Sequence, residues 1–224
     1  MSFYVRPRKM TSITQADIDS MRKNGYDPVT IRGAEARLLR FEQGSVIADQ
    51  IRAAFAGVTL GNGVGMQESR GKDDYEDDET LAKYRSYDEK DDWQKIPLSE
   101  LNRASGGLCF FDAEGMRFHL PAHLIADLRG EYNFGMAFIL THLSDHCLTQ
   151  FELLGPEQRR SVRAFLLHIL NDPDYEFDRE DIQRALDSYW TGEELDQAEQ
   201  TVAPNRSLVP TLKSTSSVRG SEDS

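Results

Sequence analysis

The sequence has few cysteines, few apolar residues and no long hydrophobic run. It contains two cysteines, Cys109 and Cys147, and its hydrophobic content is 39%. Two cysteines are too few for the disulfide framework of a small secreted domain. The longest apolar run, Met136–Leu140, is far too short to span a bilayer. The first ten residues also lack the apolar segment of a signal peptide. We therefore expect a cytoplasmic protein with no membrane segment.

Positive charge is also in short supply. The chain has 26 Lys and Arg against 38 Asp and Glu, a formal net charge of -12. Residues 73–92 hold 10 acidic and 3 basic side chains, whereas residues 1–44 hold 8 basic and 5 acidic ones. Concentrated negative charge repels nucleic acids and attracts basic proteins. The composition therefore disfavours direct nucleic-acid binding and predicts a basic protein as the partner.

Catalytic motifs are absent from the sequence. The glycine-rich stretch Gly61–Gly65 lacks the Lys-Ser/Thr of a Walker loop, and Met66 stands where a dinucleotide-binding fingerprint needs a glycine. The acidic run has no glycine at the place that an EF-hand loop requires. Cys147 directly follows His146, and adjacent side chains rarely point at each other. We assign no catalytic residue and expect no cofactor.

Helix signals run through most of the chain and divide it into three parts. We expect an N-terminal helical extension over residues 1–44, a core domain over 45–191 and a disordered C-terminal tail over 192–224. Within these parts, Pro28 begins one short helix, and Ser45 is a good N-cap for a separate helix. The polar, aperiodic composition of the last thirty residues is typical of disorder.

The stretch from Leu108 to Leu120 indicates strands and not a helix. Leu108–Phe111 and Met116–Leu120 look like two short strands, and "DAEG" between them looks like a turn. Pro121 is suited to the first position of the helix that follows. The predicted fold is therefore α+β: a mainly helical single domain with a small antiparallel β-hairpin, whose Phe110, Phe118 and Leu120 help to fill the core.

Several stretches of the core, taken together, carry a family resemblance. They are "IRAAFAGVTLGNG", "DDWQKIP", "FFDAEGMRFHLPAHL", "FELLGPEQRRSVRAFLLHI" and "IQRALDSYW". Read in order from Ile47 to Trp190, they resemble an uncharacterised family of bacterial domains of unknown function. The most specific piece is the aromatic strand with its DAEG turn and Leu-Pro-Ala helix start. The resemblance implies a bacterial origin and one compact domain, and it transfers no catalytic residue.

Two histidine pairs with a spacing of four invite a metal hypothesis. His119 and His123, with His142 and His146, could supply the ligands of a metal-dependent hydrolase. This spacing favours binding of one metal ion by both histidines only when both members of a pair lie on one helix. If Pro121 begins the helix, the first pair is split between a strand and a helix. We therefore interpret these residues as ordinary buried or surface histidines and keep the hydrolase as an alternative.

The acidic segment carries aromatic residues, a combination that supplies both electrostatic steering and anchors. The predicted partner-binding residues are Asp77, Asp78, Tyr84, Tyr87, Asp91, Asp92 and Trp93. The predicted function is a non-enzymatic, acidic protein-binding module, such as an immunity-like protein that neutralises a bacterial toxin. Two alternatives stay open. One is the histidine-based hydrolase, and the other is an accessory subunit of a larger bacterial assembly that docks through residues 1–44.

Overall fold

The computed structural model describes residues 13–103 and 107–192, and helices are the only regular secondary structure in this part of the chain. Its α-helices are α1 (Gln15–Lys23), α2 (Pro28–Ala54), α3 (Met66–Asp73), α4 (Asp78–Tyr87), α5 (Leu98–Arg103), α6 (Ala113–Leu128), α7 (Ala137–Thr141), α8 (Asp145–Gln150), α9 (Pro156–Leu170) and α10 (Arg179–Ser188). Three 3₁₀ helices complete it: η1 (Trp93–Lys95), η2 (Gly107–Phe110) and η3 (Pro173–Asp178). Since none of the described residues forms a strand, the predicted α+β class is wrong and the fold is all-α.

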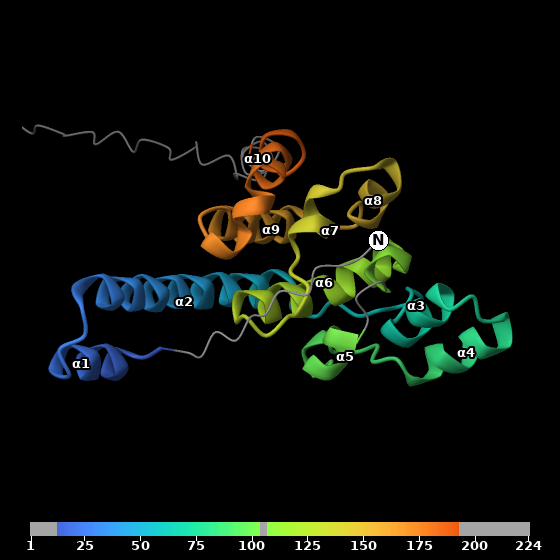
Figure 1. The fold of residues 1–224 in the computed structure, drawn as a ribbon. Helices are drawn as coiled ribbons and strands as arrows, with labels where there is room; N and C mark the ends of the chain where they lie inside the picture. Colours follow the sequence, from blue (N-terminus) through green and yellow to red (C-terminus); the bar gives the residue numbers. More distant parts are fainter. Residues whose placement is uncertain (1–12, 104–106, 193–224) are drawn as a thin grey trace, which may run out of the picture.

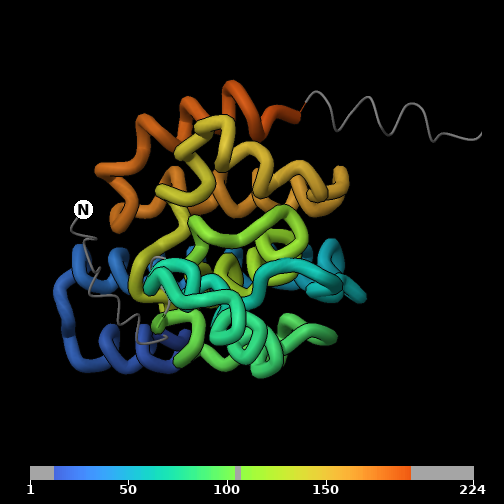
Figure 2. The backbone as a smooth tube through the Cα atoms, turned by 90° about the vertical axis from the view of Figure 1, so that its right-hand side faces the viewer, coloured from blue at the N-terminus to red at the C-terminus, as the bar shows by residue number. Residues whose placement is uncertain are grey.

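The helices are stacked in layers around α2 and α6 (Figure 1). On one side lie α7, α8, α9 and α10, and on the other lie α1, α4 and α5, while α3 lies beside the end of α6; the view at right angles also places the C-terminal helices on one side (Figure 2). The long helix α2 contacts α1, α6 and α9, and α10 packs on α7 and α9. The two central helices therefore tie the outer layers together.

Helix α2 is a single helix of 27 residues, and the predicted separate helix after Ser45 is wrong. It begins at Pro28, as predicted, and the Asp27 side chain caps it by accepting from the backbone N–H groups of Val29 and Thr30. Gly44 does not interrupt it, because the helix crosses its neighbours there. A Cβ on Gly44 would lie 3.4 Å from the His168 ring and 3.7 Å from Leu128. The expected domain boundary at residue 45 thus falls inside α2.

The predicted β-hairpin is replaced by the start of α6. Asp112 caps the helix: its Oδ1 accepts hydrogen bonds from the backbone N–H of Gly115 at 2.8 Å and of Val64 at 3.0 Å. "DAEG" is therefore a cap and first helical turn, and Pro121 lies inside the helix. Thirteen of the sixteen residues of α6 are buried. A helix that is buried on every side shows no 3.6-residue apolar pattern. The burial of its side chains offsets the cost of the internal proline.

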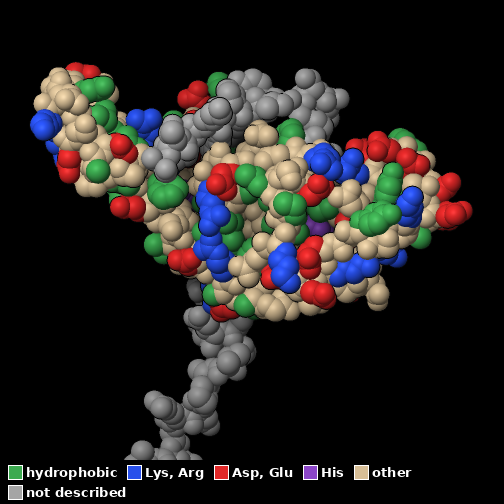
Figure 3. Space-filling model, turned by 90° about the horizontal axis from the view of Figure 1, so that it is seen from below, with side chains coloured by type: hydrophobic (Ala, Val, Ile, Leu, Met, Phe, Trp, Pro, Cys, Tyr) green, Lys and Arg blue, Asp and Glu red, His purple; other side chains and the backbone are tan. Residues whose placement is uncertain are grey.

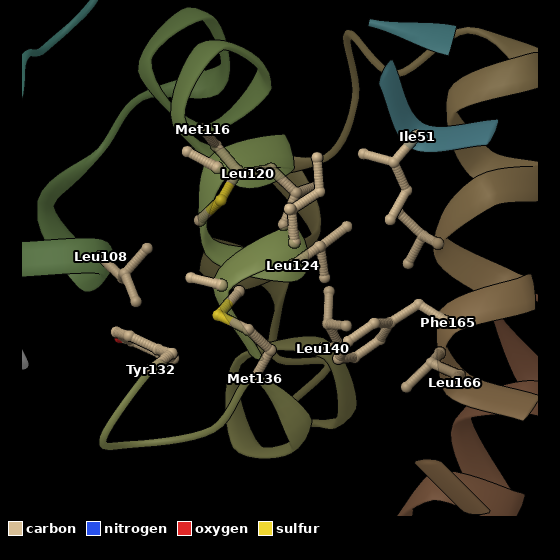
Figure 4. Packing of buried hydrophobic residues seen from close by; sticks show 14 of the residues in the cluster. Ile51, Leu108, Met116, Leu120, Leu124, Tyr132, Met136, Leu140, Phe165 and Leu166 are labelled. Atoms are coloured by element: carbon tan, nitrogen blue, oxygen red, sulfur yellow. The ribbon is translucent and has the colours of Figure 1, made fainter. Parts of the chain in front are cut away.

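The hydrophobic core surrounds α6 (Figure 4). Figure 4 shows side chains that converge from α2, η2, α6, α7, α9 and the loop after α6: Ile51, Leu108, Met116, Leu120, Leu124, Tyr132, Met136, Leu140, Phe165 and Leu166. Of the core residues expected in the hairpin, Phe118 and Leu120 are buried, whereas Phe110 is 37% exposed. Of these three expected core side chains, Phe110 therefore faces outward.

Two further predictions concern membrane-spanning segments and the disordered tail. None of the described helices combines the length and apolar character that a membrane span needs. The predicted disordered tail falls almost wholly on residues 193–224, which lie outside the described residues.

Candidate functional site

The structure does not bring the four candidate histidines together. His119 and His123 lie one turn apart on α6 and are buried, so the expectation that Pro121 separates them is wrong. His142 follows α7 and His146 lies in α8, and both are exposed. Among the described residues, no three His, Cys, Asp or Glu side chains are grouped so that they could hold a metal ion. The histidine-cluster site therefore has no geometric basis.

The two buried histidines have a fixed protonation pattern. Nδ1 of His119 lies 2.7 Å from the Gly115 carbonyl oxygen, and Nδ1 of His123 lies 3.0 Å from the His119 carbonyl oxygen. A carbonyl oxygen only accepts, so each Nδ1 carries the proton and each Nε2 presents a lone pair. Burial lowers the pKa of His119 to about 3 and that of His123 to about 4. Both rings are therefore neutral at neutral pH.

The predicted acidic surface maps onto the hairpin of α3 and α4, at one end of the molecule (Figures 1 and 3). An ion pair between a buried carboxylate and a half-exposed guanidinium holds the two helices together. Glu68 of α3 is 2% exposed and accepts two hydrogen bonds from Arg85 of α4, at 2.6 Å from Nε and 2.5 Å from Nη2. Asp88, directly after α4, accepts from the first backbone N–H groups of α3. The hairpin is thus a rigid unit.

Most of the predicted partner-binding residues lie on or near this surface. Four acids cap or flank helices at least partly in solvent: Asp77, Asp78, Asp91 and Asp92. Tyr87 is 66% exposed, and Tyr84 packs beside Gly71 between the two helices. Trp93 is only 4% exposed, and its indole N–H donates to the Phe55 carbonyl at 3.0 Å. Trp93 therefore belongs to the core and is not a surface anchor.

Tyr75 at the turn between α3 and α4 was absent from the predicted set. Its side chain is 95% exposed, and its φ of +58° is the one positive value at a non-glycine among the described residues. Its N–H bonds the Lys72 carbonyl while that of Glu76 bonds Gly71, a pattern that closes a helix and ordinarily places glycine at this position. The interleaving of Tyr with acids was its only signal in the sequence.

Beside the hairpin lies a cleft of about 400 Å³ between the start of α3, the end of α4, η1, α5 and α6. Its polar lining consists of Gln67, Tyr87, Asp88, Glu89, Lys95, Glu100 and His119, and its apolar lining includes Met66, Ile96 and Pro97. Three of these side chains are carboxylates and one is an ammonium, so the lining is acidic while His119 is neutral. Burial raises the pKa of the Asp88 carboxyl.

A family model described as a family of unknown function, DUF6714, matches residues 43–194. This is more than half of the chain. The protein belongs to the DUF6714 family. The resemblance drawn over Ile47 to Trp190 is thereby confirmed, while the bacterial origin stays a prediction. No curated protein and no solved structure matches the chain.

The DUF6714 match covers every feature of the candidate site. It includes the α3–α4 hairpin, the cleft and α6, and it begins within α2. Helix α1 and the first half of α2 lie before it. The family description supplies no activity, so the function of this DUF6714 protein has to be argued from its surface and cleft.

Proposed function

We propose that this DUF6714 protein is a non-enzymatic binding module that docks a basic protein through the acidic tip, defined as Asp73–Glu79. The observation that carries the proposal is Tyr75, fully in solvent at the apex of the tip. A tyrosine ring that is 95% exposed buries little apolar surface and so contributes little to folding. Tyrosine is enriched at protein interfaces, because it offers a large apolar face and a hydroxyl at a small entropic cost.

The backbone of Tyr75 strengthens this argument. The left-handed conformation costs a residue with a side chain roughly 1 kcal/mol. Helices α1 and α6 end with the same hydrogen-bond pattern, and both place a glycine there, Gly25 at φ +71° and Gly130 at φ +67°. Helix α3 places Tyr75 at the equivalent position, where folding alone would favour glycine. An exposed aromatic residue held at a conformational cost points to a role in binding.

The charge around Tyr75 supplies the preference for a basic partner. Six exposed carboxylates surround it in the sequence: Asp73, Asp74, Glu76, Asp77, Asp78 and Glu79. Their concentration at one end of the molecule is visible as the acidic side chains around the end of the α3–α4 hairpin (Figure 3). Charges so arranged accelerate encounters with a basic surface, and the effect weakens as salt rises.

A photo-cross-linking amino acid at position 75 tests the docking site. In lysate of the source cells, we expect position 75 to yield an adduct with a basic protein. The matched control is position 177, because Phe177 on η3 is 91% exposed and remote from the tip in sequence. Asp77→Lys with Asp78→Lys should suppress the adduct. The same adduct from both positions, an adduct indifferent to charge reversal, or no adduct at all would contradict the proposal.

Tyr75→Gly should stabilise the free protein while it weakens docking. Glycine adopts positive φ without strain, so we expect the free energy of unfolding to rise by roughly 0.5–1 kcal/mol. Urea titration measures this change. Gly25→Tyr is the matched control: no atom lies within 4 Å of its Cβ position, and it should destabilise by a similar amount. Destabilisation by Tyr75→Gly would show that the ring serves the fold.

The finer identity of the partner stays a prediction. A basic toxin would be a suitable partner for the acidic tip, and so would any other basic protein. The cytoplasmic location and the assembly role of residues 1–44 likewise stay predictions. The hydrolase alternative loses its main support, because its four histidines are not grouped.

A further inference from the structure

The cleft next to the hairpin is lined by a buried histidine whose Nε2 has no hydrogen-bond partner among the described residues. His119 is 1% exposed, its ring stacks on Phe111 at 4.4 Å, and its Nδ1 is committed to the Gly115 carbonyl. No hydrogen bond to its Nε2 occurs within the described part of the chain. Nε2 of His123 is fully enclosed by protein, whereas that of His119 is not, and His119 lines the cleft. The lone pair of His119 Nε2 can therefore accept a hydrogen bond from a ligand in the cleft.

The other polar groups of the cleft are also chiefly acceptors. Glu100 accepts from the Gln67 amide at 2.7 Å and pairs with Arg103 at 3.0 Å, and its side chain is 20% exposed. Asp88 accepts two backbone N–H groups. A carboxylate has about four lone-pair positions, so both retain accepting capacity. Lys95, the one cation in the lining, lies 3.9 Å from Asp92.

We propose that this cleft binds a guanidinium group. Carboxylates and an unprotonated imidazole nitrogen together require a ligand that is cationic and carries several N–H donors. A guanidinium presents five donors in a fixed planar fork, which suits a carboxylate better than a compact ammonium does. Met66, Ile96 and Pro97 supply an apolar wall for an aliphatic stem, and about 400 Å³ lies in the range of small-molecule sites.

Such a group can come from a free small molecule or from an arginine side chain of a polypeptide. The inference is independent of the acidic tip, because it rests on His119 and the cleft lining. Ethylguanidinium and the blocked peptide acetyl-Ala-Arg-Ala-amide distinguish the two sources. Binding that is at least about tenfold tighter for the peptide assigns the site to polypeptides, and otherwise the site belongs to small cations. The same peptide with citrulline is the neutral control.

Calorimetric titration of the full chain measures binding, and the ¹⁵N shift of His119 Nε2 reports on contact with the ring. We expect saturable binding of the guanidinium probes, a shift of that nitrogen and no binding of the citrulline peptide. His119→Phe keeps the stack on Phe111 and should weaken binding at least tenfold. Glu100→Gln, which retains a carbonyl acceptor for Gln67, should weaken it by about tenfold.

Asp181→Asn is the control variant, because Asp181 is an exposed carboxylate on α10, outside the cleft. It should leave binding unchanged. Thermal unfolding of each variant shows whether the fold is retained, and Glu100→Gln keeps the test decisive if His119→Phe is unstable. No saturation by either cation at about 10 mM, equal binding of the citrulline peptide, or binding indifferent to both cleft substitutions would overturn the proposal.

Discussion

Lowering the pH from 7 to 5 should reduce the free energy of unfolding by about 4 kcal/mol, chiefly through His119 and His123. Both rings are buried on α6, and burial lowers their pKa values from 6.5 to about 3 and about 4. Below pH 6.5 the unfolded chain takes up protons on these histidines, while the folded protein does not. Each ring therefore accounts for about 2 kcal/mol over this interval.

The sign and the pH window separate this effect from that of the carboxylates. Hydrogen bonds lower the pKa values of Asp17, Asp27, Asp77 and Glu89 from ordinary values of 3.8 and 4.5, so their contributions are lost mainly below about pH 4.5. Asp88 acts in the opposite direction, because burial raises its pKa and its carboxyl is protonated first in the folded state. A loss of stability between pH 6.5 and 5 is thus assigned to the histidines.

Urea titrations at several pH values measure the effect. His123→Phe should halve the loss to about 2 kcal/mol, since phenylalanine keeps the edge contact with Tyr132 and does not titrate. His142→Gln is the matched control: His142 is exposed, and the loss should remain about 4 kcal/mol. Equal stability of the wild type at pH 7 and pH 5 would show that these two rings are protonated in the folded state.

Gly115→Ala should destabilise the protein by about 3 kcal/mol, although alanine is the better helix former by about 1 kcal/mol. Gly115 is in the first turn of α6, where the backbone of the glycine-rich loop crosses it. A Cβ at Gly115 would lie 2.4 Å from the Val64 carbonyl oxygen and 3.0 Å from Asp112 Oδ1. The first contact is with backbone, so the loop and helix must separate to relieve it.

Gly33→Ala provides the control for this prediction. Gly33 is an exposed residue of α2, and nothing lies within 4 Å of its Cβ position. Alanine there should stabilise the protein by roughly 0.5–1 kcal/mol, as helix propensity alone predicts. Chemical denaturation of both variants gives the two changes. If both substitutions raise the free energy of unfolding, the Val64 backbone does not lie in close contact with Gly115 in solution.

Similar close contacts explain why the stretch Gly61–Gly65 is rich in glycine. A Cβ at Gly63 would lie 2.6 Å from the Gly115 backbone nitrogen, and one at Gly65 would lie 2.2 Å from Asp88. These glycines allow the chain to pass close to α6 and to the residue that caps α3. Their role is steric, which local spacing could not reveal.

Local signals in the sequence favour several of the helix starts that the structure shows. The Thr14–Asp17 capping box, the Asp27-Pro28 start of α2 and the Pro156 start of α9 depend on neighbouring residues, and each is present in the structure. The errors occurred where burial overrides local preference. Pro121 lies inside α6, and Gly44 lies inside α2, because packing on neighbouring helices stabilises a continuous helix through both.

The sequence by itself determined the family, the acidic charge and its concentration in residues 73–92. These properties depend only on which residues occur and in what order. Tertiary structure alone decided that Trp93 is buried, that Tyr75 stands free in a left-handed turn and that His119 faces the cleft. Whether an aromatic ring is exposed, and whether a nitrogen lone pair accepts a hydrogen bond, depends on segments far away in the chain. The spacing of residues in the sequence does not encode either property.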